Sequence, residues 1–333
     1  MGKLVQSRQL IKIVFSLLIF SSIAVFLVQS DLSAIGSQLR KIGFRFIYVL
    51  LSTVLAYLFG TLAWWICLGK MKHKISIPAL FAIRQIGETV GLFNPASVIG
   101  GDWVKADLVS RYGIPGQKAV DAVAIARITA VLSQLTLFLA AVFWLMFSPL
   151  KKEVMRYTGN SIYGVCIVLF VLVIVIFCWL ISTKAPPKPA DIPLDFWNRT
   201  KVSIETLLWR IREFYQQQNR VFWYAYLLSA IHWLAGSVEF YLLLTFMGVD
   251  VSLMHGLLLD MSVIILKSTG AFIPGQLGIE ELSNKLLLTM IGVGGGSLWL
   301  SISILRRARQ VFWIALSAVF YLCIKRKKRY ATV

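Results

Sequence analysis

The chain has 333 residues, of which 58% are hydrophobic and 15% are charged. This composition excludes an ordinary soluble domain and is typical of a protein that crosses a membrane several times. The net charge of +19 would suit nucleic-acid binding, but the basic residues flank apolar stretches and no soluble domain exists to hold a duplex. We therefore predict one integral membrane domain over 1–333 and no nucleic-acid partner.

Six apolar stretches are long enough to cross the hydrocarbon core, which takes about 20 helical residues. They cover 10–29, 46–69, 116–148, 160–183, 220–247 and 297–324. No small-residue cleavage site closes the first stretch, so we expect it to persist as a helix. The four cysteines lie inside apolar segments without ligand-like spacing, which predicts neither disulfides nor a zinc site.

The distribution of lysine and arginine favours cytoplasmic N- and C-termini, because these residues collect on the cytoplasmic side of membrane spans. One threading places both chain ends, the loop after 46–69 and the segment 184–220 in the cytoplasm. The opposite side then keeps a smaller basic group, which weakens this orientation without reversing it: Arg40, Lys41, Arg45, Lys151 and Lys152.

Two further apolar regions, 77–112 and 251–293, are too long for one helix and are broken near Pro95 and Pro274. Proline removes a helical hydrogen bond, and broken backbone at membrane depth survives only where protein or a wet cavity surrounds it. We therefore predict two re-entrant helical hairpins that face an interior site. Eight fully spanning helices are the alternative.

The two broken regions carry similar motifs. Residues 94–102 read Asn-Pro-Ala-Ser-Val-Ile-Gly-Gly-Asp, and residues 273–281 read Ile-Pro-Gly-Gln-Leu-Gly-Ile-Glu-Glu. The same sequence distance separates Asp102 from Arg127 and Glu281 from Arg306. We predict an all-α fold of six spans and two hairpins, arranged as an inverted repeat of 1–148 and 160–324.

Charged residues inside the apolar regions mark the candidate site. An ionised side chain at the bilayer centre costs at least ~2.5 kcal/mol on insertion scales and is tolerated when paired or hydrated. We expect Asp102 to pair with Arg127 and Glu281 to pair with Arg306, either to fix packing or to contact cargo. The predicted substrate-binding residues are Arg84, Asn94, Gly100, Gly101, Asp102, Lys105, Arg127, Lys267, Gln276, Gly278, Glu280, Glu281 and Arg306.

A half-helix is expected to begin after each proline, and its free amides would attract an anion such as phosphate. Asp102 and the pair Glu280 and Glu281 offer an alternative, because acidic side chains at a helix N-terminus cap the same amides in cis. In that case the arginines, rather than the amides, would hold the anion.

The segment 190–220 mixes large apolar and basic residues after a proline-rich lead-in, which favours an amphipathic interfacial helix on anionic inner-leaflet lipid. A solvated connector is the alternative. Elsewhere, His232 and Glu239 share a helix face and are a possible proton relay, or a buried pair without a transport role. The sequence holds no metal-ligand spacing, nucleophile elbow or phosphate loop, so we predict no catalytic residues, no metal and no cofactor.

The paired motifs at 91–105 and 273–281 resemble those of the lysylphosphatidylglycerol synthase transmembrane-region family, and the resemblance covers nearly the whole chain. Lys105 occupies a position where members of that family usually have arginine. Lysine keeps the positive charge but lacks the planar guanidinium that can donate two hydrogen bonds to one phosphate. The resemblance implies a relation to the flippase half of bacterial multiple-peptide-resistance enzymes, or to stand-alone relatives associated with hopanoid, polyprenyl-linked or archaeal glycolipid pathways. We expect a stand-alone member without the soluble aminoacyl-transfer domain.

These observations lead to the prediction of a flippase-like protein in a bacterial or archaeal cytoplasmic membrane. Its cargo would be a phospholipid or a polyprenyl-linked lipid whose anionic or zwitterionic headgroup enters a charged cavity at mid-membrane. The alternatives are a membrane-embedded lipid-modifying transferase and a non-transporting subunit that serves envelope-lipid or glycolipid biosynthesis enzymes.

Overall fold

A computed structural model describes residues 21, 32–93, 97–182, 196–269, 276, 278–293 and 298–331, and regular structure within them is entirely helical. The first half contains α2 (Leu32–Ile42), η1 (Gly43–Arg45), α3 (Phe46–Cys67), η2 (Gly69–Lys74), α4 (Ile77–Phe93), α5 (Ser97–Ser110) and α6 (Gly116–Phe147). The rest contains α7 (Lys151–Thr158), α8 (Ser161–Ile181), α9 (Phe196–Gln217), α10 (Asn219–Phe246), α11 (Leu253–Thr269), α12 (Ile279–Met290) and α13 (Leu298–Ala331).

Five helical segments of the described chain are long and apolar enough to cross a membrane: Ser33–Cys67, Gly116–Phe147, Ser161–Ile181, Asn219–Phe246 and Leu298–Lys325. They correspond to five of the six predicted spans. The predicted span at 10–29 lies outside the described residues, apart from position 21. The chain is therefore an all-α, multi-pass membrane protein in its described part.

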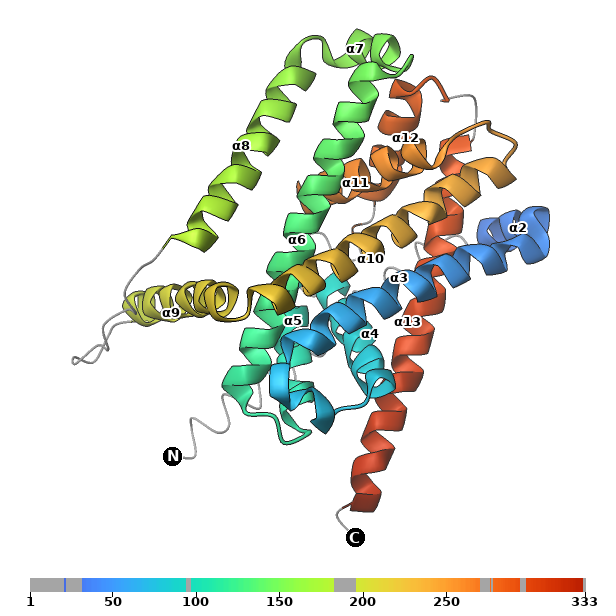
Figure 1. The fold of residues 1–333 in the computed structure, drawn as a ribbon. Helices are drawn as coiled ribbons and strands as arrows, with labels where there is room; N and C mark the ends of the chain where they lie inside the picture. The colour runs from blue at the N-terminus through green and yellow to red at the C-terminus, as the bar shows by residue number, and fades with distance from the viewer. Residues whose placement is uncertain are drawn as a thin grey trace.

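The two broken apolar regions each form a pair of helices, α4 with α5 and α11 with α12, and the members of each pair pack against each other. The breaks expected at Pro95 and Pro274 lie outside the described residues. The first pair lies toward the end of the molecule where the C-terminus is found, and the second lies toward the opposite end (Figure 1).

Long helices surround these pairs. α6 and α13 run in opposite directions along the molecule, and α3 and α10 lie side by side, also antiparallel, across it (Figure 1). Hydrogen bonds join the halves at this crossing: Trp313 Nε1 on α13 donates to Thr53 Oγ1 on α3 at 3.1 Å, and Trp233 Nε1 on α10 donates to the Ala130 carbonyl on α6 at 2.8 Å. Both bonds lie where the cavity described below is enclosed.

Close helix contact in the first pair depends on glycine. A Cβ added at Gly101 of α5 would lie 2.5 Å from the Gly87 carbonyl oxygen and 3.0 Å from the Gly91 Cα, both on α4. Such a contact is too short for any side chain and involves backbone that cannot move aside. The Gly-Gly-Asp motif therefore has a packing role at Gly101.

α8 and α9 lie at the side of the bundle (Figure 1). α8 is apolar throughout, and Ile167 and Val168 are 63% and 66% exposed, as expected of a helix that faces lipid. α9 shows that the segment predicted at 190–220 contains a helix, and its contact with anionic inner-leaflet lipid stays a prediction. Its Arg210 bonds to Asp121 of α6 at 3.3 Å, and its Arg212 donates to the Trp179 carbonyl of α8 at 2.9 Å, so these two arginines face protein rather than a free lipid-facing surface.

Candidate functional site

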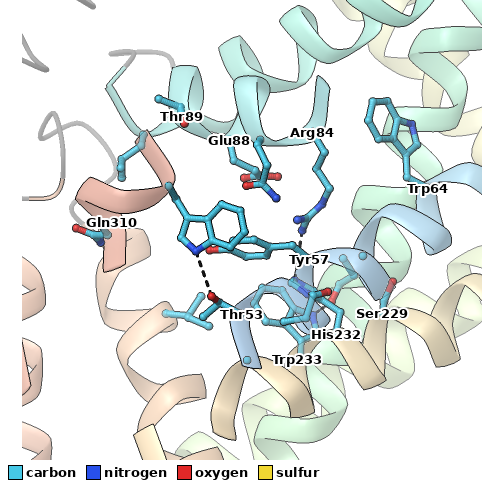
Figure 2. A pocket seen from close by; sticks show the side chains of 18 of the residues that line it. Thr53, Tyr57, Trp64, Arg84, Glu88, Thr89, Ser229, His232, Trp233 and Gln310 are labelled. Atoms are coloured by element: carbon cyan, nitrogen blue, oxygen red, sulfur yellow. Dashed lines mark hydrogen bonds between the residues drawn. The ribbon is translucent and has the colours of Figure 1, made fainter. Parts of the chain in front are cut away.

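A cavity of about 360 Å³ lies between the two halves, within the usual size range of ligand pockets. Side chains from α3, α4, α5, α6, α10, α11 and α13 line it, and Figure 2 shows part of this lining. Eight of the residues singled out from the sequence meet here: Arg84, Asp102, Lys105, Arg127, His232, Glu239, Lys267 and Arg306. Sequence positions more than 200 residues apart thus contribute to one polar chamber.

The first half contributes a cluster of four charges. Arg127 of α6 holds Asp102 of α5 in a two-pronged pair, with Nε and Nη2 donating at 3.0 and 2.7 Å, as predicted. Lys105, one helical turn after Asp102, donates to it at 3.1 Å and to Glu88 of α4 at 2.6 Å. The side chains of Glu88 and Arg127 remain 42% and 34% exposed, so this cluster is accessible.

The second half contributes a more buried cluster. Arg306 of α13 donates through Nε to Glu280 of α12 at 2.7 Å and lies 3.4 Å from Asp260 of α11. Lys267 of α11 donates to the other oxygen of Glu280 at 2.8 Å. The side chains of Arg306 and Glu280 are only 3% and 5% exposed. The guanidinium also lies over the Phe240 ring at 4.1 Å, which favours a cation at this position.

The predicted pair between Glu281 and Arg306 is wrong by one position. Glu281 pairs with Arg307, and Glu280 pairs with Arg306. Two adjacent acids on α12 point roughly 100° apart around the helix, so each meets a different arginine of α13. Motif alignment alone does not distinguish two neighbouring carboxylates.

At the start of α12, one backbone amide that could have bound an anion is capped by an acidic side chain of the protein itself. Glu281 Oε2 accepts the Gly278 backbone N–H at 2.9 Å, so the Glu281 side chain caps the start of this helix. Gly278 has a φ of 81°, which favours glycine. A carboxylate of the chain itself therefore occupies this amide. Gly278, Glu280 and Glu281 do not line the cavity directly, although Glu280 bonds to residues that do.

The remaining predicted positions lie elsewhere. Gln276 and Gly101 line a smaller cavity of about 140 Å³, next to Glu88, Lys105 and Arg127. Gly100 lies in the first turns of α5 and lines neither cavity. Asn94 lies outside the described residues.

Arg84 differs from the other cavity cations because it has no carboxylate partner among the described residues. Six basic side chains of the described chain line the cavity against four acidic ones, and Glu280 brings a fifth carboxylate to its wall. One positive charge is left over. Arg84 Nη2 lies 3.4 Å from His232 Nε2, its guanidinium lies 5.1 Å from the Tyr57 ring centre, and its buried Nη1 has no hydrogen-bond partner in the described part (Figure 2).

The surroundings of Arg84 hold it in place. His232 Nδ1 lies 2.7 Å from the Ala56 carbonyl, which only accepts, so Nδ1 carries the proton and Nε2 offers its lone pair to Arg84. Gly60 of α3 leaves room for the guanidinium, since a Cβ there would lie 2.9 Å from Arg84 Nη2. His232 thus orients a cation.

Two other donors among the residues that line the cavity were missed from the sequence. Trp64 Nε1 and Gln85 Nε2 line the cavity, are buried and have no hydrogen-bond partner among the described residues. We call Trp64, Arg84 and Gln85 the donor wall. Tryptophan and glutamine in an apolar helix resemble ordinary membrane-helix residues, so the only available signal was the position of Gln85 beside Arg84.

The two members of the possible proton relay have separate partners. Glu239 of α10 accepts from Arg309 Nη1 of α13 at 2.7 Å, whereas His232 contacts Arg84 and Ala56. Within the described chain no hydrogen bond joins His232 to Glu239. His232 and Glu239 therefore line the same cavity without a direct contact that would relay a proton between them.

Comparison with known proteins gives one match. The family model described as "Lysylphosphatidylglycerol synthase TM region" matches residues 9–318, nearly the whole chain. Neither the curated proteins nor the solved structures contain a significant match. On the extent of the family match, this chain belongs to the lysylphosphatidylglycerol synthase TM-region family.

Proposed function

We propose that this protein moves a lipid, or the headgroup of a lipid-linked intermediate, between the leaflets of a bacterial or archaeal cytoplasmic membrane. The observation that carries the proposal is the donor wall. It combines a guanidinium that has no carboxylate partner with two buried N–H donors that have no hydrogen-bond partner, all judged among the described residues. Unpartnered buried donors are costly, and an oxyanion such as a lipid phosphate is an acceptor that such donors bind.

The other cations have a different role in this proposal. Arg127 and Arg306 each hold a carboxylate that belongs to the neighbouring helix pair. Removing either partner would leave the other with less counter-charge, and the cost is larger at the more buried pair of Arg306 and Glu280. We assign these pairs to fixing the helix pairs against α6 and α13, while Lys105, Arg127, Lys267 and Arg306 set the positive potential that a headgroup meets.

The arrangement of helices supports a transporter. We propose that 1–148 and 160–324 form an inverted repeat, in which α4–α5 and α11–α12 are re-entrant hairpins. In support, the two helix pairs lie toward opposite ends of the molecule, and α6 runs antiparallel to α13 (Figure 1). Hairpins that enter from opposite sides allow one central site to open to each leaflet in turn. The lipid tail would remain in the bilayer beside the apolar helices.

The test is a leaflet assay on the purified full chain in liposomes that contain a fluorescent phospholipid. We expect the wild-type protein to translocate the label, and Arg84→Gln to slow translocation by about 10- to 100-fold, the effect of losing a charged hydrogen bond of ~1.5–3 kcal/mol. Arg111→Gln is the matched control, because Arg111 is an exposed residue paired with Asp107. It should keep the wild-type rate.

The same assay separates the proposal from its rivals. A wild-type rate for Arg84→Gln, or no translocation of any lipid class, would contradict the proposal. Product formation from an added donor substrate would favour a transferase. Activity that needs a co-purified envelope-lipid or glycolipid enzyme and is unaffected by Arg84→Gln would favour a non-transporting subunit.

A further inference from the structure

A separate cavity lies between residues 66–73, at the end of α3 and in η2, and residues 218–231, at the start of α10. We call it the outer groove. Its volume is about 650 Å³, within the usual size range of ligand pockets, and it shares no lining residue with the central cavity. Ser229 and His232 of α10 line the central cavity (Figure 2), whereas their neighbours Leu228 and Ile231 line the outer groove. α10 therefore separates the two.

One wall of the outer groove is apolar and follows a single face of α10. Its residues recur three and four positions apart: Val221, Tyr224, Leu227, Leu228 and Ile231. Tyr224, Leu227 and Ile231 are 63%, 54% and 40% exposed, so no described part of the chain covers this stripe. From Val221 to Ile231 the stripe is about 15 Å long. That length equals about half of a hydrocarbon core of ~30 Å, which is the depth of one leaflet.

The end of the outer groove at η2 is cationic. Lys70, Lys72 and His73 line it, and no Asp or Glu of the described chain does. Trp65 fixes this end, because its Nε1 donates to the Lys72 carbonyl at 3.0 Å and its ring centre lies 4.8 Å from Lys72 Nζ. Gln218 also lines the groove and makes no side-chain cap to α10, so the first amides of α10 add partial positive charge there.

The shape and charge of the outer groove match an anionic phospholipid. Basic pockets between membrane helices bind anionic headgroups, and the apolar stripe is as long as one leaflet is deep. A headgroup ammonium would find no carboxylate among the described lining residues. The chain's own N-terminal segment fits less well, because residues 1–12 carry Lys3, Arg8 and Lys12 and no acid. A second copy docked through the same face would bring a second set of the same cations.

We infer that the outer groove binds an anionic phospholipid as a resident partner, separate from any cargo of the central cavity. The acyl chain covers the stripe of α10, and the phosphate contacts Lys70 and Lys72 of η2. The bound lipid thereby holds the end of α3 against the start of α10 from the membrane side. This inference goes beyond the proposed function, because it requires neither the donor wall nor any movement of lipid between leaflets.

The experiment is photo-crosslinking of the purified full chain in phosphatidylcholine vesicles. The vesicles contain a small fraction of phosphatidic acid or of phosphatidylcholine that carries a diazirine in its acyl chain. Mass spectrometry measures adducts on Tyr224, Leu227 and Ile231 relative to adducts on the exposed Ile167 and Val168 of α8. We expect this ratio to be about 10- to 30-fold higher for phosphatidic acid, because each lysine near a membrane surface favours an anionic headgroup by roughly 5-fold.

Variants of the cationic end and of the apolar stripe locate the effect. Lys70→Gln combined with Lys72→Gln should bring the phosphatidic acid ratio to within about 3-fold of the phosphatidylcholine ratio. Lys118→Gln is the matched control, because Lys118 is exposed on α6 and lies outside the groove. Leu227→Trp fills the groove and should remove most adducts on Tyr224 and Ile231 for both lipids. Leu234→Trp, two turns further along the same face and outside the groove, should not.

Three results would overturn the inference: equal ratios for the two lipids, a high ratio that persists in the double lysine variant, or loss of the phosphatidic acid adducts when inorganic phosphate is added. An unlabelled stripe beside a labelled α8 would also overturn it, since segment 1–31 or a second copy would then fill the groove. Arg84→Gln should leave the ratio unchanged. Failure of the donor wall as an anion site is thus distinguishable from failure of the outer groove as a lipid site.

Discussion

At the scale of single residues, Arg84 shows how a membrane protein keeps one cation available. Most charges that line the cavity are neutralised by a partner on a neighbouring helix, which makes them inexpensive to bury. Arg84 instead has an imidazole nitrogen and an aromatic face, which orient the guanidinium without cancelling its charge. Its position depends on the absence of a side chain at Gly60.

Gly60→Ala tests this dependence at the residue scale. The added Cβ would lie 2.9 Å from Arg84 Nη2, the flexible end of a side chain, so Arg84 should move while the helices stay in place. We expect translocation to fall by about 10-fold, the effect of one displaced charged hydrogen bond. The unfolding temperature should stay within a few degrees of the wild-type value, because alanine favours a helix by up to ~1 kcal/mol over glycine.

Gly164→Ala is the control for this substitution, since a Cβ at Gly164 of α8 meets nothing within 4 Å. It should leave translocation unchanged. A Gly60→Ala protein with the wild-type rate would show that Arg84 does not need this space.

At the scale of helices, the ion pairs connect each broken helix pair to a long helix. Asp102 joins α5 to α6, and Glu280 joins α12 to α13 and, through Lys267, to α11. Gln310 Nε2 adds a further bond to Glu280 at 2.9 Å. Glu280 is therefore the centre of the second cluster, whereas Glu281 caps α12 and pairs with Arg307 nearer its edge.

Comparing the two adjacent acids tests this difference. Glu280→Gln leaves Arg306 and Lys267 buried with less counter-charge and should destabilise the protein by about 3–5 kcal/mol. Glu281→Gln should cost about 1 kcal/mol, since a partly exposed pair and a cap are affected. Thermal unfolding in detergent measures both, with Glu153→Gln, whose side chain is 42% exposed, as the surface control. Equal losses for Glu280→Gln and Glu281→Gln would contradict this assignment.

At the scale of the whole molecule, the cavity forms between helices of the two halves of the chain, α3 to α6 on one side and α10, α11 and α13 on the other. Hydrogen bonds from α10 to α3 and α6, from α13 to α3, and from α4 to α13 join the halves around it. The first-half cluster is the more accessible, since the side chains of Glu88 and Asp260 are 42% and 8% exposed. The two charged clusters of the cavity wall therefore differ in exposure.

Membrane topology provides the test at this scale. In a background without cysteines, Arg111→Cys reports the side of the loop after α5, and Thr289→Cys reports the end of α12. With re-entrant hairpins in an inverted repeat, a membrane-impermeant maleimide should label Arg111→Cys only from the cytoplasmic side and Thr289→Cys only from the outside. Labelling of both from the same side would rule out this arrangement.

The sequence by itself determined the class of the protein and the positions of its helices. The length of an apolar stretch and the position of a proline within it are local properties of the sequence. The five described spans and the two divided regions follow from them. The pair of Asp102 and Arg127 was also predictable, because a repeated spacing between opposite charges implies contact on neighbouring helices. Family membership followed from the paired motifs and is shown by the match over 9–318.

Only the tertiary structure decided which charges are neutralised. The register of α12 against α13 selects Glu280 over Glu281 for Arg306, and this depends on helix rotation that spacing does not specify. The donor wall is equally invisible in the sequence, because whether Trp64, Arg84 and Gln85 lack partners depends on every residue packed around them. Whether a polar group has a hydrogen-bond partner depends on every residue around it, so the donor wall appears only when α3, α4 and α10 come together.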